Sequence, residues 1–333
     1  MGFALNQIQS NCNHEESSIG SANWGESKNW SYKGLRVHYR VTGENSNVPI
    51  VLIHGFGASC DHWRNNAETF ASEGFKVYGI DLLGFGQSEQ NFNGKIKYLD
   101  NQIWANQLAT FIEEIVDVKR NGKVILIGNS LGSLTAITTL SQTPELIKTI
   151  IAAPLPEPVS ISPLKTSLPN WLEKVKTFLI KLFFNLIPLT PLINLISKTK
   201  LITFALQSAY FQSILNDKSL KRIVSVPARR PHASKALKSM CIGMSNRKNS
   251  AKGPSIIEKI QNLPNRPPIL LIWGKQDKLI PLFLAKKLIK LHPWIKLSVI
   301  DNAGHCLHDE LPNHFNQIVL KWLENLKNSK QPI

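Results

Sequence analysis

Short apolar runs alternate with amphipathic stretches along most of this chain, and this pattern predicts alternating strands and helices. The apolar runs are rich in Val, Ile and Leu and predict strands at 50–53, 75–82, 123–127, 149–153, 268–273 and 296–300. Apolar residues spaced three or four apart predict helices at about 100–115, 131–137, 281–292 and 313–326. This alternation predicts an α/β fold with a mostly parallel central sheet and helices on both of its faces.

One further segment shows a different period. Between Leu35 and Val41, apolar residues alternate with Arg36, His38 and Arg40. A period of two is typical of a strand with one buried face. We therefore predict an edge strand whose polar face meets water.

Two segments depart from the alternation. Residues 1–29 are polar and aperiodic, which predicts a loose N-terminal tail. Trp24 and Trp30 are the candidates for docking this tail on the core at 30–154 and 263–333. Residues 155–262 lack buried-strand patterns and predict an inserted helical cap. Within the cap, Leu182–Ser197 carries no charge but includes two prolines and is shorter than the roughly 20 residues of a membrane span. We expect its apolar residues to line a substrate pocket or to dip into a membrane interface.

Composition fits a globular protein, with 43% hydrophobic and 19% charged residues over 333 positions. The four cysteines, Cys12, Cys60, Cys241 and Cys306, form no framework, which predicts a reducing compartment and no structural zinc. The N-terminus lacks a basic patch followed by an apolar core, so we expect no secretory signal and take the cytoplasm as the working assumption.

The formal net charge of +16 is concentrated in the cap. Between residues 155 and 260 there are 17 Lys or Arg and 4 Asp or Glu, an excess of 13 positive charges. This excess has three interpretations: contact with an anionic membrane surface, contact with nucleic acid, or a compositional bias without function. No nucleic-acid-binding motif accompanies the charge, so we expect no nucleic-acid partner.

The strand at 123–127 ends in Gly128-Asn129-Ser130-Leu131-Gly132, followed at once by a helical pattern. A Gly-x-Ser-x-Gly sequence between strand and helix predicts a nucleophile elbow, a sharp turn that exposes the serine hydroxyl. Gly128 and Gly132 are the positions where a side chain would obstruct the turn, and Asn129 completes it. Ser130 is the candidate nucleophile.

Asp277 and His305 also follow predicted strands, and the order Ser, Asp, His is the one expected for this fold. Ser130 would attack a carbonyl, His305 would carry the proton, and Asp277 would orient the imidazole. For the base, His308 is expected as a supporting group and His54 as a structural one. For the acid, Glu157 at another strand end is the alternative, while Asp81 and Asp301 are expected to order their turns. Cys306 is expected to pack rather than react.

An oxyanion hole requires two backbone N–H groups beside the reacting carbonyl. Leu131 follows the nucleophile and would supply one of them. Phe56 would supply the other from the loop that begins His54-Gly55-Phe56-Gly57, in which His54, Gly55 and Gly57 are expected to shape the turn.

Taken together, these motifs resemble the α/β-hydrolase superfamily, and within it the pheophytinase and chlorophyll dephytylase type of chloroplasts and cyanobacteria. The resemblance rests on the motifs HGFGAS at 54–59, HWR at 62–64, DLLGFGQS at 81–88, GNSLG at 128–132 and AGHCLHDELP at 303–312. It implies an α/β-hydrolase fold and cleavage of the phytyl ester of chlorophyll or pheophytin, with peripheral attachment to a thylakoid-type membrane. The sequence departs from the pattern at Ser133, where such relatives often have glycine.

The leading hypothesis is therefore a serine hydrolase that cleaves a bulky lipophilic carboxylic ester through an acyl-enzyme. Three alternatives stay open: a general esterase or lipid hydrolase, a carbon–carbon bond hydrolase with the same triad, and a non-catalytic pigment- or lipid-binding accessory protein. An Asp nucleophile is excluded because position 130 is serine. We expect no metal and no organic cofactor, and a lipophilic ester as the small-molecule partner.

Overall fold

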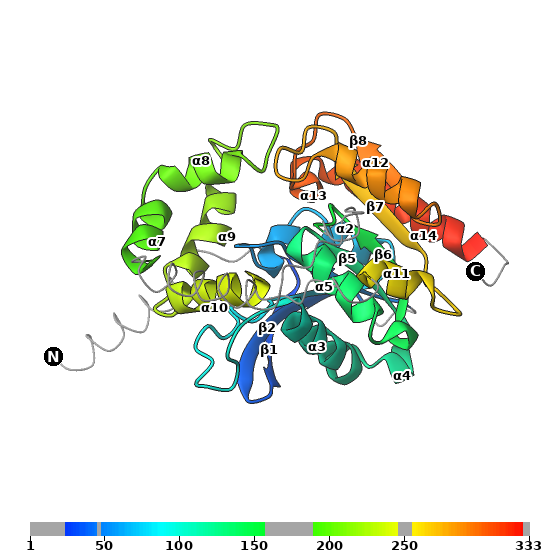
Figure 1. Cartoon of the computed structure of the whole chain (residues 1–333), viewed down its shortest axis with the longest axis horizontal. Coiled ribbons are helices and arrows are strands. Elements are labelled where there is room, and N and C mark those ends of the chain that lie inside the picture. The colour runs from blue at the N-terminus through cyan, green and yellow to red at the C-terminus, as the bar shows by residue number, and fades with distance from the viewer. Residues whose placement is uncertain (1–23, 45–47, 157–188, 246–254, 329–333) are drawn as a thin grey trace, which may run out of the picture.

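The computed structural model describes residues 24–44, 48–156, 189–245 and 255–328 (Figure 1). Within them, one sheet of eight strands has the order β1-β2-β4-β3-β5-β6-β7-β8. β2 pairs antiparallel with β1 and β4, and every other neighbouring pair is parallel. The strands are β1 (Glu26–Tyr32), β2 (Leu35–Thr42), β3 (Pro49–Ile53), β4 (Lys76–Ile80), β5 (Val124–Gly128), β6 (Ile147–Ala152), β7 (Ile269–Gly274) and β8 (Lys296–Ile300). The predicted α/β class and mostly parallel sheet are confirmed.

Helices cover both faces of the sheet. One face packs against α3 (Asn101–Phe111), α5 (Leu131–Leu140), α11 (Ile256–Gln261) and α12 (Leu282–Leu291). The other packs against α2 (Ala67–Ser72) and α14 (Pro312–Asn328). The shorter helical segments are η1 (Cys60–Trp63), η2 (Ile112–Val116), α4 (Val118–Asn121), η3 (Pro144–Leu146) and α13 (Leu307–Glu310).

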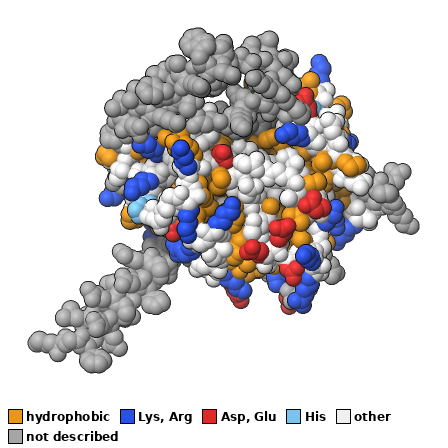
Figure 2. Space-filling view, turned by 60° about the horizontal axis from the view of Figure 1, so that its bottom comes forward, with side chains coloured by type: hydrophobic (Ala, Val, Ile, Leu, Met, Phe, Trp, Pro, Cys, Tyr) orange, Lys and Arg blue, Asp and Glu red, His pale blue; other side chains and the backbone are white. Residues whose placement is uncertain are grey.

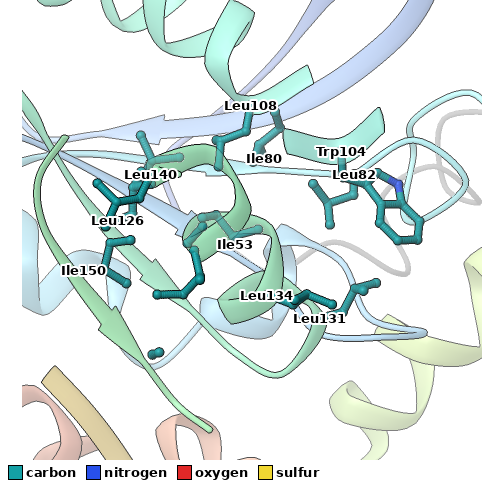
Figure 3. Close-up of a cluster of buried hydrophobic side chains, with 14 of the residues drawn as sticks. Ile53, Ile80, Leu82, Trp104, Leu108, Leu126, Leu131, Leu134, Leu140 and Ile150 are labelled. Atoms are coloured by element: carbon teal, nitrogen blue, oxygen red, sulfur yellow. The ribbon is translucent and has the colours of Figure 1, made fainter. Parts of the chain in front are cut away.

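The first of these two layers forms a continuous apolar core, part of which Figure 3 shows. Trp104 and Leu108 of α3 and Leu134 of α5 lie against strand residues such as Ile53 and Leu126, and all five are buried. Burying a side chain of this size stabilises the fold by roughly 1.5–3 kcal/mol. The carboxyl ends of β3 and β5, where the predicted active-site motifs begin, therefore rest on a well-buried apolar core.

The N-terminal strands correct two of the predictions. β1 begins at Glu26 and Trp24 is buried, so the core starts before residue 30 and residues 26–29 are not part of a loose tail. The segment at 35–41 is a strand but not an edge, because β2 lies between β1 and β4. Most of its polar face is also covered: Arg36 is exposed, but His38 and Arg40 are buried and pair with Asp81 and Asp61.

The predicted cap range contains helices that lie to one side of the sheet (Figure 1). They are α7 (Leu189–Lys198), α8 (Leu201–Gln207), α9 (Lys218–Ala228) and α10 (Ala233–Ser245). Of the uncharged stretch at 182–197, the part at 189–197 belongs to α7 and the rest lies outside the described residues. The predicted boundary at 262 falls too late, because Ile257 and Ile260 of α11 pack in the core with α5. No helix in the described part of the chain is both long and apolar enough to cross a membrane.

Candidate active site

A cavity of about 420 Å³ lies between the cap helices and the strand ends of the core. Ser130, His305 and Phe56 line it from the core side. The other side is formed by apolar residues of α7 to α10. Among the described residues that line the cavity, none is Lys, Arg, Asp or Glu. The site is thus a largely apolar chamber with a serine and a histidine in its wall.

Ser130 occupies the turn between β5 and α5 with φ +51° and ψ −112°. A non-glycine residue with a positive φ is strained and persists only where the surroundings hold it. Here the Ser130 N–H donates to the carbonyl of Pro154 at 3.2 Å, and the Asn129 N–H donates to Ile53 at 3.0 Å. The neighbouring strand ends therefore hold the turn that presents the hydroxyl.

Gly128 and Gly132 lie where neighbouring backbone passes too close to leave room for a side chain. A Cβ on Gly132 would lie 2.1 Å from the carbonyl oxygen of Ile53, and one on Gly128 would lie 2.5 Å from the Gly132 carbonyl carbon. Both distances are too short for any side chain. Gly55 faces a similar limit, since its Cβ would lie 2.5 Å from Asn129 Oδ1, while Gly57 has φ +72° in the open part of the loop.

Two polar side chains fasten the elbow to its neighbours. The Asn129 amide donates to the carbonyls of Ala153 at 2.7 Å and His305 at 3.2 Å. The Ser133 hydroxyl donates to the Gly128 carbonyl at 2.6 Å and accepts from the Ala153 N–H at 3.0 Å. Ser133, the departure from the family pattern, thus ties β5 to the end of β6.

His305 and Asp277 are brought together by the loops after β8 and β7. His305 Nδ1 lies 2.9 Å from Asp277 Oδ2, and the Asp277 side chain is buried. The other carboxylate oxygen, Oδ1, accepts from the N–H groups of Leu279 and Ile280 at 2.8 Å each. Because Nδ1 faces a carboxylate, the second ring nitrogen, Nε2, is available to accept a proton.

The alternatives for these roles lie elsewhere. Asp301 is exposed and pairs with Lys275, and Glu157 lies outside the described residues. His308 is buried behind the site with its ring centroid 4.2 Å from that of Trp63, and burial holds its pKa well below the usual value. Cys306 is buried in a small apolar cluster, where burial raises the pKa of its thiol and so disfavours the reactive thiolate.

The loop after β3 places Phe56 on the cavity wall. Leu131 is the first residue of α5, and the first N–H groups of a helix have no acceptor within it. His54 supports the loop from beneath: its Nε2 accepts from the Leu82 N–H at 3.1 Å, so its Nδ1–H donates to the Gly55 carbonyl at 2.7 Å. Burial lowers the pKa of His54, so it stays neutral in this structural place.

A second hydrogen-bonded series of a serine, a histidine and an aspartate lies outside the cavity. The Ser27 hydroxyl is 2.9 Å from His38 Nε2, and His38 Nδ1 is 2.8 Å from Asp81 Oδ2. Ser27 is exposed on β1 in a regular strand and does not line the cavity. It therefore lacks the turn and the pocket that accompany Ser130, although its hydroxyl also faces a histidine.

Cys60 lies next to this second Ser–His–Asp series. Potential metal-ligand atoms of His38, Cys60 and Asp81 lie within 4.8 Å of one another. The Asp81 carboxylate, however, already accepts from His38 Nδ1 and from the N–H groups of Cys60 and Gln87. Burial also raises the pKa of Cys60, which opposes formation of a thiolate ligand. The cluster is built to hold three segments together rather than to receive an ion.

Comparison with known proteins agrees with this architecture. The family model of the alpha/beta hydrolase fold matches residues 48–312, so the chain belongs to the alpha/beta hydrolase family. Among curated proteins it is similar to a 2-hydroxy-6-oxononadienedioate/2-hydroxy-6-oxononatrienedioate hydrolase of Burkholderia vietnamiensis, 27% identical over 87% of this chain and 91% of that protein. It is also similar to chloroplastic pheophytinase of Arabidopsis thaliana, 26% identical over 90% of this chain and 66% of that protein.

A solved structure of similar shape is an esterase from Thermogutta terrifontis, with a TM-score of 0.64 at 18% identity over 90% of this chain and 99% of that one. At that identity the likeness concerns the fold. The family match establishes that the chain is a hydrolase of this family, and the relatives confirm the resemblance to pheophytinase. The names of the two curated relatives differ in the substrate that they give.

Sequence reasoning did not single out the polar residues that join the cap to the site. Tyr210 lines the cavity and its hydroxyl contacts His62 and Asp309. Arg64 bridges Asp309 and the cap residue Asp217. Positions 62–64 and 309 fall inside the motifs that carry the family resemblance. Those motifs are the sequence signal that could have identified them.

Proposed function

We propose that this protein is a serine hydrolase that cleaves a carboxylic ester of a bulky apolar substrate, with the phytyl ester of chlorophyll or pheophytin as the best candidate. The observation that carries the proposal is the position of Ser130 and His305 in the wall of one apolar cavity. A volume of about 420 Å³ falls in the range of roughly 300–1,000 Å³ that small-molecule sites occupy.

In the first half of the reaction, Ser130 attacks the ester carbonyl while His305 takes the hydroxyl proton. The N–H groups of Phe56 and Leu131 stabilise the oxyanion of the tetrahedral intermediate. Collapse of that intermediate breaks the ester bond, and His305 gives its proton to the departing alkoxide. The products of this half are an acyl-Ser130 enzyme and a free alcohol.

In the second half, water attacks the acyl-enzyme and His305 takes its proton. The second tetrahedral intermediate releases the carboxylic acid, and the proton returns to Ser130. Asp277 stabilises the imidazolium in both halves, because its carboxylate faces His305 Nδ1. Every bond formed and broken is accounted for by one ester and one water.

The cavity wall favours an ester over the substrates of the carbon–carbon bond hydrolases. The name of that relative describes a dioate, a molecule with two carboxylates. A carboxylate buried without a cationic partner loses its hydration at a cost of several kcal/mol. The described lining residues include no Lys or Arg to compensate that loss, whereas an apolar chain meets favourable contacts.

The substrate is tested by incubating the purified protein with chlorophyll a and with pheophytin a and separating the pigments by chromatography. De-esterified pigment and free phytol are the expected products. Turnover of a simple ester without product from either pigment would reject the phytyl ester and leave a general esterase.

Covalent labelling with a fluorophosphonate separates an enzyme from a non-catalytic binding protein. We expect one label per chain, lost in Ser130→Ala and kept in Ser27→Ala, the matched control at the other serine that faces a histidine. An unlabelled wild-type protein would favour the accessory-protein alternative. Loss of the label in Ser27→Ala but not in Ser130→Ala would identify Ser27 of β1 as the nucleophile.

The proposal includes peripheral contact of the cap with an anionic membrane. Large apolar side chains are exposed on α7 and α8, namely Leu195, Leu201 and Phe204, the last of which is 71% exposed. Lys198 and Lys200 stand between them. On the face shown in Figure 2, basic side chains (blue) are spread over the surface while acidic ones (red) gather mainly in its lower part. Apolar residues beside lysines fit the boundary between acyl chains and anionic headgroups.

Sedimentation with vesicles tests this contact. We expect binding to anionic vesicles that weakens as salt rises, and about tenfold weaker binding for Phe204→Asp, because burying such a side chain contributes roughly 1.5–3 kcal/mol. Val299→Asp, at an exposed apolar position on strand β8, is the control that should bind as wild type. Binding that ignores lipid charge would assign the basic excess to compositional bias.

A further inference from the structure

The cap segment that follows α8 is docked on the loop that carries His305. The carbonyl of Ala209 accepts from the backbone N–H groups of His305 at 2.8 Å and Cys306 at 3.2 Å. A Cβ on Gly304 would lie 2.8 Å from the Ala209 oxygen, so the two backbones touch. The backbone of the candidate base is therefore held partly by the cap.

The next cap residue, Tyr210, adds a side-chain link. Its hydroxyl lies 2.7 Å from His62 Nε2 and 2.9 Å from Asp309 Oδ2. A carboxylate can only accept, so the Tyr210 O–H donates to Asp309 and His62 Nε2–H donates to the Tyr210 oxygen. Burial lowers the pKa of His62, which favours its neutral form.

Asp309 belongs to α13, the short helix that begins two residues after His305. Arg64 holds the same carboxylate through Nε at 2.9 Å and Nη2 at 3.1 Å, and its guanidinium also pairs with Asp217 at the start of α9. The next residue, Glu310, accepts from the N–H groups of Gln212 in the cap and Gly304 in the loop. Four cap residues thus link to residues 305–310: Ala209, Tyr210 and Gln212 directly, and Asp217 through Arg64.

We propose that Tyr210 is a positioning residue: through its hydroxyl bridge to His62 and Asp309 it fixes α13 and the His305 loop, so that the imidazole is aligned only when the cap is docked. Tyr210 is also one of the residues that line the cavity. A substrate that fills the cap side of the cavity presses on the same residue that holds the base. Alignment of the base is thereby coupled to occupancy by a large substrate, which deepens the proposed function and rests on it for the role of His305.

Tyr210→Phe tests this by removing the hydroxyl and keeping the ring. We expect the rate constant for fluorophosphonate labelling of Ser130, and kcat per labelled site for a p-nitrophenyl ester, to fall about tenfold or more, since small misplacements in a site can cost up to about a hundredfold. KM should change by less than about twofold. Hydrogen exchange at the amides of His305 and Cys306 should become faster, because their acceptor, Ala209, is no longer held.

Tyr39→Phe, which removes a hydroxyl from a buried tyrosine of β2 outside the cavity, is the control and should behave as wild type. Asp309→Asn removes the charge from the other end of the bridge and should shift the same readouts in the same direction, which keeps the test decisive if Tyr210→Phe folds poorly. A purely structural role would lower the melting temperature and the number of labelled sites while leaving kcat per labelled site unchanged, and that result would overturn the proposal.

The exchange measurement distinguishes failure of this inference from failure of the proposed function. A wild-type protein that takes no label would reject the serine hydrolase. Faster exchange at His305 in Tyr210→Phe would still show that the cap holds the loop, and unchanged exchange would reject the bridge whether or not the protein is an enzyme.

Discussion

At the scale of single residues, the Asp277 carboxylate shows how the site fixes which nitrogen of the His305 imidazole carries the proton. One oxygen, Oδ1, is held by two backbone N–H groups of the following turn, and the other, Oδ2, faces His305 Nδ1. The turn fixes the carboxylate, and the carboxylate fixes the imidazole tautomer. The two oxygens therefore have separate tasks.

Asp277→Asn is expected to lower kcat by about 10³–10⁴ with little loss of stability. The Asn oxygen would keep the two backbone donors, which turns the Asn NH₂ toward His305 Nδ1. Nδ1 then acts as the acceptor and the ring proton sits on Nε2, so that Nε2 cannot accept the proton of Ser130. Asp301→Asn, at the exposed end of the neighbouring strand, is the control and should keep full activity. Steady-state kinetics with a p-nitrophenyl ester and thermal unfolding would measure both; an active Asp277→Asn would point to another acid.

The candidate site was predictable at residue level only where a motif and a strand end coincide. Ser130, Asp277 and His305 all follow predicted strands, and a parallel sheet brings such ends to one edge. Tyr210 was not accessible in this way. It lies in the cap, where no regular sheet specifies which residues meet, and its partner Asp309 is 99 positions away.

At the scale of elements, the loop after β4 is fastened by one buried acid. The Asp81 carboxylate accepts from His38 of β2, from the Cys60 N–H at the start of η1 and from the Gln87 N–H. Burial alone would raise the pKa of Asp81, but the hydrogen bond and charge of His38 outweigh it and lower the pKa to about 2. This network also explains why His38, on the polar face of β2, is buried: its partner comes from a distant segment that period-two alternation cannot reveal.

Because the folded pKa of Asp81 lies below the unfolded value, its contribution to stability is present above about pH 4 and is lost as the pH falls toward 2. We expect the free energy of unfolding of the wild type to drop by about 2 kcal/mol more than that of Asp81→Asn between pH 5 and pH 2. Urea unfolding of both proteins across this range measures the difference. Parallel pH profiles would show that Asp81 is not the linked group.

At the scale of the whole molecule, the cavity lies between the cap and the core, with the cap helices at one end of the view in Figure 1 and β8, α12 and α14 at the other. Most strands and core helices follow from the hydrophobic period, whereas the order of the strands in the sheet does not. The cap boundary did not, because α11 carries an apolar face like a cap helix and only its contact with α5 shows where it packs.

Because the cavity lies between two parts of one chain, a ligand that fills it should stabilise the folded protein. Ligand-induced stabilisation can therefore distinguish an apolar ester substrate from a dioate. A ligand that binds only the folded protein raises the free energy of unfolding by RT ln(1 + [L]/Kd), about 2.7 kcal/mol at 100 times Kd. For Ser130→Ala protein, we expect phytol to raise the melting temperature by several degrees, because the described wall of the cavity is apolar. Nonanedioate, with two carboxylates and no described cation to meet them, should leave it unchanged. Stabilisation by the dioate and not by phytol would favour carbon–carbon bond hydrolysis and place the missing cation among residues of the chain beyond the described lining.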